Sequence, residues 1–375
     1  MSAMNRRVIL SGLAATGASL AVACGRSSRD DAAVTERRDP TVLRALPLGE
    51  PPWPTIDPFL FCVHHNDAYP AGNERLGPAT SLLGRRLGMD FSGLDGWSMY
   101  HGDVVPGFPQ HPHRGFETVT VVRRGLLDHS DSLGATARYG HGDVQWLTTG
   151  SGILHAEMFP LLSEEQPNPV ELFQLWLNLP SVDKFAEPHF SMFWSDSVPK
   201  VEQTDEQGRR ARVTIIAGAW GHIKAPAPPP RSWAAHADSD VAIWTLQLDS
   251  GASFILPAAQ KGSRRMLYVF RGDGVDIDGG NYAGGQALEL RGDHETSVLA
   301  SSSDLELLLL QGRPIGEPVV KRGPFVMNSE QEIEQAYADF RRTRFGGWPW
   351  RRPDPVHERE GRFAKHADGR LERPV

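Results

Sequence analysis

The stretch that decides the fold of this chain begins with Gly107-Phe-Pro-Gln-His111-Pro-His113-Arg-Gly-Phe-Glu117 and ends with Gly152-Ile-Leu-His155-Ala-Glu157. It contains a His-x-His pair and a His-x-Glu pair. Because successive side chains of a β-strand point to opposite faces, a spacing of two places both members of a pair on one face. If these faces line one small barrel, three imidazoles and a carboxylate converge. That donor set suits a first-row divalent metal.

Two residues compete for the carboxylate position. Glu157 shares its strand face with His155, whereas Glu117 lies four residues after His113 and would share that histidine's face on a regular strand. Gly115 stands between His113 and Glu117 and can introduce a bend or bulge. Parity alone therefore does not choose between Glu117 and Glu157.

The composition favours β-structure. The chain has 38 Gly and 29 Pro, more than a helical protein would tolerate, and β-branched runs such as residues 118–122 recur between turn residues. Residues 170–179 alternate cleanly between two faces, as a strand does. A length of 375 residues is sufficient for two ordinary domains with tails.

The second half of the chain repeats the strand pattern without the histidine pairs. In place of His-x-His it has Ala258-Ala-Gln-Lys-Gly-Ser263, and His294 is the only histidine within its predicted strands. We therefore expect a second barrel that holds no metal. Short apolar runs predict its strands at residues 243–248, 252–256, 265–270, 286–290 and 305–310.

One helix is predicted near the C-terminus. Ser329-Glu-Gln-Glu332 has the pattern of a capping box, in which the serine and the glutamate satisfy each other's backbone N–H groups. An apolar stripe that would pack on a barrel follows at Ile333, Ala336, Tyr337 and Phe340. The charged, proline-containing residues 347–375 are predicted to form an exposed tail.

The N-terminus has the layout of an export signal over residues 1–24. Arg6-Arg7 precedes a short apolar run of small residues, which resembles a twin-arginine signal, and the run ends at Cys24 in a sequence that resembles a lipobox. The alternative is an ordinary cleaved signal in which Cys24 is incidental. Residues 25–52 lack periodicity and read as a flexible tether.

Charge and cysteine content narrow the class further. The formal net charge of -7 gives no electrostatic reason to expect nucleic-acid binding. Beyond the N-terminal segment there is no apolar run long enough to span a membrane, so membrane contact is expected only through a lipid anchor at Cys24. If Cys24 carries lipid, Cys62 has no partner, and no disulfide is expected.

These motifs resemble the pirin family of the cupin superfamily. The resemblance rests on HPHRGFETVT (111–120), DSLG (131–134), GDVQWLTTGSGILHAEM (142–158), FQLWLNLP (173–180) and GPFVMN (323–328). It implies an all-β bicupin, with a metal-binding N-terminal cupin at 53–199 and a metal-free C-terminal cupin plus short helix at 200–346. Both cupins would be barrels of the jelly-roll kind.

The resemblance also implies one mononuclear metal site in the first barrel. Its ligands would be His111, His113, His155 and Glu157, whereas Glu117 would not be a ligand. Fe(II) is the first expectation for the metal, with Ni, Cu, Mn or Co as alternatives. Three further histidines of this half, His101, His129 and His141, are expected to be structural or exposed.

The function implied is a metal-dependent dioxygenase of the quercetin 2,3-dioxygenase type, which cleaves a flavonol-like substrate with O2. Glu157 would be the catalytic base that accepts the substrate's hydroxyl proton. The alternative is a metal-dependent redox or ligand sensor of the cell envelope without turnover, and a third hypothesis is a purely structural metal. We expect a monomer exported to the periplasm or cell envelope, with a small aromatic substrate and O2 as partners.

One segment departs from the pirin pattern. The chain between Val63 and His111 is longer than in pirins and includes residues 73–92, rich in Gly and Arg. An insertion here could reshape or cover the mouth of the pocket, or it could be a surface loop remote from the site. The sequence leaves both alternatives open.

Overall fold

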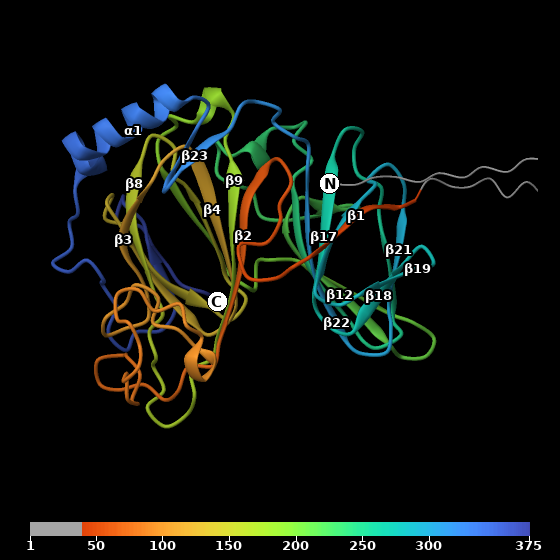
Figure 1. Ribbon diagram of the computed structural model, residues 1–375, viewed down its shortest axis with the longest axis horizontal. Coiled ribbons are helices and arrows are strands. Elements are labelled where there is room, and N and C mark those ends of the chain that lie inside the picture. The colour runs from red at the N-terminus through yellow and green to blue at the C-terminus, as the bar shows by residue number, and fades with distance from the viewer. Residues whose placement is uncertain (1–39) are drawn as a thin grey trace, which may run out of the picture. The chain divides into compact units, whose positions relative to one another are not determined.

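The computed structural model describes residues 40–375, and these residues form mainly β-strands (Figure 1). These residues contain two barrels and one α-helix, which confirms the prediction of an all-β fold with a short C-terminal helix. The predicted signal at 1–24, with Cys24, lies outside the described residues.

The first barrel is built from two antiparallel sheets. The larger contains β26 (Leu371–Glu372), β25 (Phe363–Lys365), β6 (Thr136–Gly140), β5 (Leu126–Asp131), β8 (Ile153–Met158) and β3 (Gly107–His113), in that order. The other contains β10 (His189–Phe193), β7 (Val144–Thr148), β4 (Phe116–Arg124), β9 (Val170–Asn178) and β2 (Phe59–Asp67). Alternation along β9 divides its side chains as the sequence predicts. Gln174 and Trp176 line a cavity, whereas Phe173 and Leu175 enter an apolar core.

The second barrel has a larger sheet and a smaller one. The larger contains β1 (Val42–Pro47), β20 (Gln286–Leu290), β17 (Arg264–Arg271), β22 (Leu305–Gly312), β15 (Ala242–Leu248), β12 (Arg210–Ala217) and β11 (Lys200–Thr204). The smaller contains β16 (Ser253–Leu256), β21 (Thr296–Ala300), β18 (Gly274–Ile277) and β19 (Gly280–Ala283), and β13 (Ala219–Trp220) pairs with β14 (Ile223–Lys224). Leu246, Phe254, Leu267 and Val298 from the two sheets form one buried apolar cluster. His294 lies in a bend between β20 and β21, not in a strand as predicted.

The two barrels share a hydrophobic core. Val119 and Phe173 of the first barrel belong to the same buried cluster as Met266 and Leu308 of the second. At the edge of this cluster the side chain of Arg123 forms an ion pair with Glu306 across the two halves. The five-stranded sheet of the first barrel and the larger sheet of the second barrel are therefore packed against each other by their outer faces.

Helix α1 (Glu330–Thr343) packs beside the hairpin formed by β23 (Val320–Arg322) and β24 (Phe325–Met327) (Figure 1). The side chain of Ser329 accepts a hydrogen bond from the backbone N–H of Glu332, and the Glu332 carboxylate accepts one from the N–H of Asn328. Ile333 and Ala336 are fully buried in this contact. The predicted apolar stripe and the serine half of the capping box are confirmed, whereas Glu332 caps the N–H of Asn328 instead of that of Ser329.

The prediction of a tether at 25–52 is wrong for its last part. Residues 42–47 form β1, which pairs antiparallel with β20 at the edge of the second barrel. An edge strand has neighbours on one side only, so most of its side chains are exposed and its sequence carries little apolar signal. Residues 25–39 lie outside the described part of the chain.

The prediction of an exposed tail at 347–375 is also wrong. Strand β25 pairs with β6 of the first barrel, and Phe363 and Ala364 are buried there. The buried guanidinium of Arg138 forms an ion pair with Asp128 at 2.7 Å and donates to the carbonyl of Glu360 at 2.8 Å. The tail therefore covers an edge of β6 that would otherwise present unpaired backbone groups.

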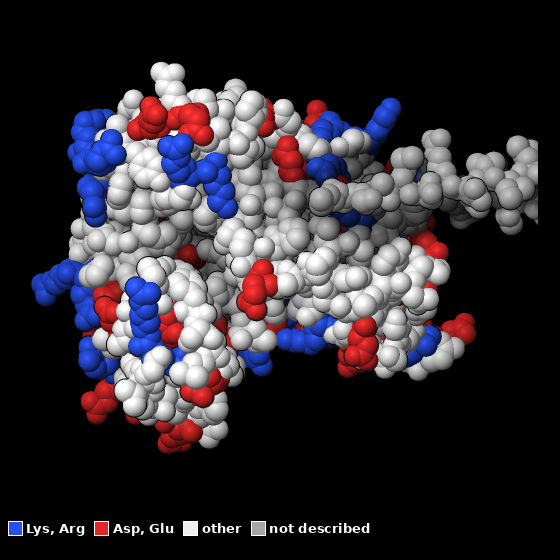
Figure 2. All heavy atoms as spheres, viewed as in Figure 1, with Lys and Arg blue, Asp and Glu red and all other residues white. Residues whose placement is uncertain are grey.

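The outer surface carries charges of both signs. On the face drawn in Figure 2, Lys and Arg are interspersed with Asp and Glu over both barrels. Within residues 40–375, no helix combines the length and apolar character needed to cross a lipid bilayer.

Candidate metal centre

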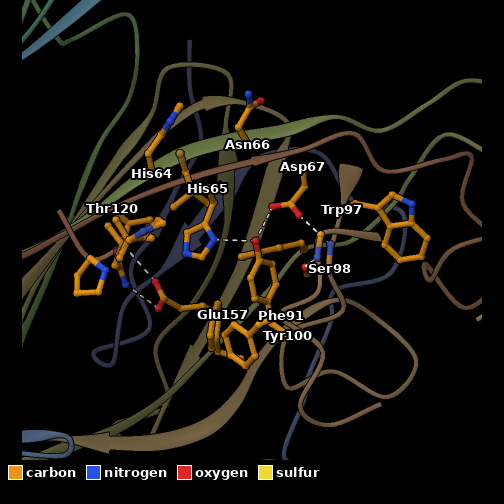
Figure 3. A pocket seen from close by; sticks show the side chains of 18 of the residues that line it. His64, His65, Asn66, Asp67, Phe91, Trp97, Ser98, Tyr100, Thr120 and Glu157 are labelled. Carbon is orange, nitrogen blue, oxygen red and sulfur yellow. Dashed lines mark hydrogen bonds between the residues drawn. The ribbon is translucent and has the colours of Figure 1, made fainter. Parts of the chain in front are cut away.

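The first barrel contains a cavity of about 810 Å³ between its two sheets. Its wall combines aromatic rings with polar side chains (Figure 3). This combination is typical of sites for small organic molecules. The polar members include His65, Asp67, His111, His113, Thr120, Glu157 and Gln174, and the aromatic ones include Phe61, Phe91, Trp97, Tyr100, Phe108, Phe159 and Trp176.

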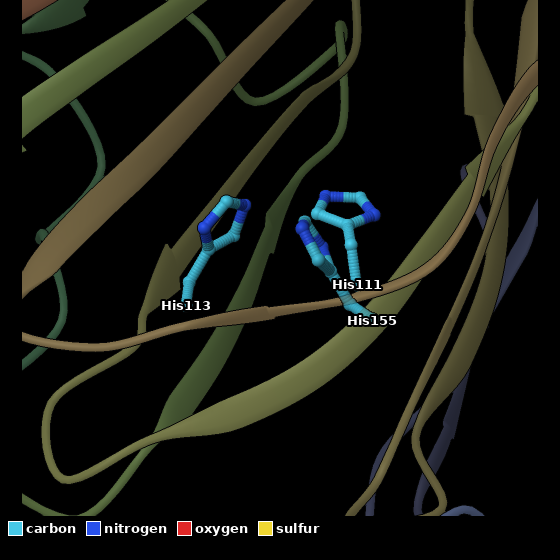
Figure 4. A group of neighbouring side chains, drawn as sticks. All are labelled: His111, His113 and His155. Atoms are coloured by element: carbon cyan, nitrogen blue, oxygen red, sulfur yellow. The ribbon is translucent and has the colours of Figure 1, made fainter. Parts of the chain in front are cut away.

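The three predicted histidine ligands lie together (Figure 4), with His111 and His113 at the wall of this cavity and His155 fully buried beside them. Strand β3 carries His111 and His113, β8 carries His155, and the antiparallel pairing of these strands places His111 directly opposite His155. One nitrogen of each ring lies within 4.8 Å of the corresponding nitrogens of the other two. The geometry that the spacing predicts for the three imidazoles is therefore present.

Gly115 allows the chain to turn sharply after the His-x-His pair. Its φ of +86° lies in the left-handed region, and a Cβ at this position would stand 2.0 Å from the carbonyl oxygen of Val326. Any other residue would clash with the β24 segment that packs there. The turn separates the face of His113 from the face of Glu117.

Hydrogen bonds orient two of the three rings. Nδ1 of His111 donates to the carbonyl of Pro109 at 2.9 Å, and Nδ1 of His113 faces the carbonyl of Pro324 at 3.4 Å. A neutral imidazole that donates through Nδ1 carries its free electron pair on Nε2. In both rings the nitrogen available to a metal is therefore Nε2.

His155 supplies the test of whether a metal fits here. The ring is fully buried, and among the described residues neither of its nitrogens has a hydrogen-bond partner. Leaving a buried polar atom without a partner costs about 1–3 kcal/mol, so such atoms are uncommon in folded proteins. A metal ion bonded to one nitrogen would remove part of that cost, and the three imidazoles fit a first-row divalent metal.

The environment keeps all three imidazoles neutral. Burial lowers the pKa of His111 to about 4 and lowers the pKa values of His113 and His155 well below the ordinary value. The positive charge that each ring would carry also disfavours protonation of its neighbours. Metal ligation requires the unprotonated ring, so the site is ready for a metal at neutral pH.

Glu157 lies beside the histidines but is bonded elsewhere. Its Oε2 is 3.9 Å from Nε2 of His155 and accepts a hydrogen bond from Nε2 of Gln174 at 2.9 Å, while its Oε1 lies 3.2 Å from the hydroxyl of Thr120. Burial raises the pKa of this carboxyl group, and the charge of His129 and the two hydrogen bonds oppose the rise. The group of donor atoms that lie within 4.8 Å of one another contains the three histidines and not Glu157.

Glu117, the competing carboxylate, does not line the cavity. It is fully buried and accepts hydrogen bonds from the hydroxyl of Thr148 at 2.7 Å and from that of Ser232, in the second half of the chain, at 2.5 Å. The turn at Gly115 breaks the parity that would have placed it with His113. This carboxylate connects the two halves of the chain.

The other three histidines divide into two groups. His101 and His141 are exposed, as predicted. His129 is fully buried, its Nε2 lies 3.2 Å from Asp131, and its ring centroid is 5.6 Å from that of His155. The pairing of β5 with β8 sets it directly opposite Glu157.

Sequence reasoning missed the wall formed by the inserted segment. Phe91, Trp97 and Tyr100 from this segment line the cavity together with His65 and Asp67 of β2. Of the two alternatives, the insertion therefore reshapes the pocket. The signal that could have found part of this wall is the period-two spacing of His65 and Asp67, which puts both on one face of β2.

Comparison with known proteins agrees with the fold. Residues 51–177 match the pirin family, and residues 243–346 match the pirin C-terminal cupin domain. Human pirin is 35% identical over 258 residues, which are 66% of this chain and 80% of that protein. A Pseudomonas aeruginosa protein provisionally named quercetin 2,3-dioxygenase is 39% identical over 239 residues, 64% of this chain and 79% of its own.

A solved structure gives the same result. The crystal structure of quercetin 2,3-dioxygenase from Acinetobacter baumannii superposes with a TM-score of 0.61 and 28% sequence identity. The superposition covers 78% of this chain and 87% of that one.

Proposed function

Because the chain belongs to the pirin family, we propose that it is a metal-dependent dioxygenase that cleaves a flavonol-like substrate with O2. The observation that carries the proposal is the set of three neutral imidazoles, two of them at the wall of a cavity large enough for a small aromatic molecule and the third buried beside them. The likeness to a quercetin 2,3-dioxygenase of known structure supports the choice of reaction.

His111, His113 and His155 would hold the metal, and we propose Glu157 as the fourth ligand, with Fe(II) as the first metal to test and Ni, Cu, Mn and Co after it. A divalent metal bound there would supply a Lewis acid for a substrate oxygen. To reach it, the Glu157 carboxylate would exchange a hydrogen bond to Thr120 or Gln174 for the metal.

Glu157 is the proposed catalytic base. A raised pKa makes its carboxylate a stronger acceptor for the hydroxyl proton of a flavonol. Thr120 and Gln174 hold the carboxylate at the cavity wall, so that it does not rotate away from a bound substrate. The rings of Phe108 and Trp176 give a planar substrate apolar surfaces and exclude water from the reacting groups.

The test is turnover by metal-loaded protein. The apoprotein is loaded separately with Fe(II), Ni(II), Cu(II), Mn(II) and Co(II) and mixed with quercetin under O2, and the loss of flavonol absorbance is followed. We expect turnover with at least one metal and a roughly 10²- to 10⁴-fold lower rate in Glu157→Gln, the loss that removal of a general base causes. His155→Ala should lose turnover together with metal content.

His222→Gln is the matched control, because His222 is an exposed histidine of the second barrel. It should keep the wild-type rate. Absence of quercetin turnover with all five metals, under conditions in which the protein contains one bound metal per chain, would reject the proposal.

We also propose, from residues 1–24 alone, that the protein is exported and anchored by lipid at Cys24. Cell fractionation of the wild type and of Cys24→Ser would test this. The anchor predicts a membrane-associated wild type and a variant released into the soluble fraction outside the inner membrane. Equal distribution of both proteins would contradict it.

A further inference from the structure

We propose that His65 is a second substrate-binding residue of this pocket, which accepts a hydrogen bond from a hydroxyl group that the substrate carries away from the metal. The proposal rests on the function proposed above and makes its substrate class more specific. The preferred substrate would be a flavonol with at least two separated hydroxyl groups, one at the three-histidine cluster and one at His65.

His65 belongs to the same cavity as the three-histidine cluster but to another wall. It lies on β2, whereas the cluster lies on β3 and β8, and His65 lines the same cavity as His111 and His113 of β3. In the view of Figure 3, the His65 ring stands between the hydroxyl of Tyr100 and the carboxylate of Glu157. The ring also makes edge contacts with the rings of Tyr100 and Phe108, at centroid distances of 4.9 and 5.9 Å.

A chain of hydrogen bonds determines which nitrogen of His65 carries the proton. The hydroxyl of Tyr100 donates to Oδ2 of Asp67 at 2.8 Å, and the same hydroxyl oxygen lies 2.9 Å from Nδ1 of His65. A hydroxyl has one proton to donate, and Tyr100 uses it on Asp67. Nδ1 of His65 must therefore be the donor to Tyr100, which leaves Nε2 as an acceptor.

The Asp67 end of this chain of hydrogen bonds is equally constrained. Oδ1 of Asp67 accepts the backbone N–H of Ser98 at 2.9 Å, so both carboxylate oxygens are used as acceptors. Burial raises the pKa of Asp67 to about 6, and the carboxyl group is therefore ionised at pH 8. Burial and the neighbouring His64 lower the pKa of His65 to about 4, so that its ring is neutral.

Nε2 of His65 is free to accept from a ligand. Among the described residues, no side chain or backbone group donates a hydrogen bond to it, whereas Nδ1 is occupied by Tyr100. An imidazole nitrogen held as an acceptor at the wall of a cavity that also carries aromatic rings selects a donor, and the hydroxyl of a phenol is a strong one.

The inserted segment is held firmly enough to fix this arrangement. Tyr100 has a φ of +55°, a conformation that costs a bulky residue about 1–3 kcal/mol and is kept only where the surroundings impose it. The almost fully buried guanidinium of Arg85 bonds to Asp90 at 3.0 Å and to the carbonyl of Trp97 at 2.8 Å, and lies 3.3 Å from the centroid of the Trp97 ring. These contacts hold the loop that presents the Tyr100 hydroxyl.

The first test compares two ligands in wild type and His65→Ala. Affinities for quercetin, which has several hydroxyl groups, and for 3-hydroxyflavone, which has only the one beside the carbonyl, are measured at pH 8 by quenching of tryptophan fluorescence. We expect the variant to bind quercetin about 3- to 10-fold more weakly, the effect of one neutral hydrogen bond, and to bind 3-hydroxyflavone as the wild type does. His222→Gln should match the wild type with both ligands.

The second test inverts the hydrogen-bond chain. In Asp67→Asn the amide oxygen remains bound to the N–H of Ser98, so the amide nitrogen faces Tyr100 and donates to it. Tyr100 must then donate to Nδ1 of His65, and Nε2 of His65 becomes a donor. We expect this variant to lose affinity for quercetin and to gain affinity for a quercetin whose hydroxyl groups on the pendant ring are methylated, because methoxy oxygens can only accept. Tyr100→Phe leaves the tautomer of His65 undetermined, so its affinities for both ligands should lie between those of the wild type and of Asp67→Asn.

The outcomes separate this inference from the proposed function. If His65→Ala lost affinity for both ligands equally, or lost affinity for neither, the role of His65 would be overturned even if the enzyme turns over flavonols. Selective loss of quercetin affinity by a protein that never turns over a flavonol would support His65 and reject the dioxygenase. Failure of the wild type to bind either flavonol would overturn both.

Discussion

At the scale of single residues, the site depends on which polar groups are satisfied and which are not. Thr120 and Gln174 satisfy Glu157, and backbone carbonyls orient His111 and His113, but within the described residues His155 has no hydrogen-bond partner. A metal bound at the three histidines would satisfy one of these buried nitrogens.

Metal affinity should distinguish Glu157 from Glu117, the two carboxylates between which strand parity did not choose. Glu157→Gln should weaken binding of Ni(II), measured by calorimetry, by about tenfold or more, because it removes a negative ligand or, at the least, a charge beside the ligands. Glu117→Gln is the matched control, since Glu117 lies outside the cavity, and its affinity should equal that of the wild type. Equal affinities in all three proteins would show that Glu157 does not contribute to the site.

Glu117 should give the stability a specific pH dependence. Burial raises its pKa to about 7, so the folded state keeps a proton that the unfolded chain releases near its ordinary value of 4.5. The stability that this group contributes is complete below about pH 4.5 and is lost as pH rises through about 7, a change on the order of 3 kcal/mol.

Urea denaturation of the wild type and of Glu117→Gln between pH 4.5 and 7.5 would measure this change. The free energy of unfolding of the wild type, relative to the variant, should fall steadily over that range. A constant difference would mean that Glu117 titrates in the folded protein as it does in the unfolded chain.

At the scale of elements, the C-terminal tail completes the first barrel. Strand β25 adds to β6, and the buried ion pair of Arg138 with Asp128 holds the chain that leads to it. The N-terminal part of the described chain does the same for the second barrel, because β1 adds to the edge strand β20. Each barrel therefore depends on a short strand from outside its contiguous sequence.

Removal of residues 363–375 should lower the thermal midpoint by several degrees. The deletion exposes the edge of β6 and removes the burial of Phe363 and Ala364, at a cost of roughly 2–4 kcal/mol. Removal of residues 373–375 alone, which lie beyond β26, is the control and should leave the midpoint unchanged. Differential scanning calorimetry would measure both, and equal midpoints for the two deletions would show that the tail strands add no stability.

At the scale of the whole molecule, the two barrels are joined through a common core. The cluster that contains Val119 and Phe173 continues into Met266, Tyr268 and Leu308 of the second barrel. Neither the five-stranded sheet of the first barrel nor the larger sheet of the second could lose its partner without exposing an apolar face to water. The second barrel, whose own interior is filled with apolar side chains, supports the site without forming part of its histidine cluster.

The shared core predicts one cooperative unfolding transition. Leu308→Ala should destabilise the protein by about 2–5 kcal/mol and lower the denaturation midpoint reported by tryptophan fluorescence and by far-ultraviolet circular dichroism equally. Leu299→Ala, on an exposed position of the second barrel, should have little effect. Two separate transitions, with only one of them shifted, would show that the barrels unfold independently.

The sequence by itself determined the features that depend on local spacing. Period-two patterns predicted the strands and placed His111, His113 and His155 toward one point, and the capping box predicted the start of helix α1. These predictions succeed because strand parity and helix capping depend on residues two to four positions apart.

Tertiary structure decided what depends on distant partners. Because of the turn at Gly115, Glu117 contacts Ser232 and not the three-histidine cluster. The pairing of β25 with β6 makes the predicted tail part of the first barrel. The packing of the inserted segment brought Tyr100 to His65 and gave the cavity its second polar wall. No short pattern encodes these contacts, because each joins segments that only the folded chain brings together.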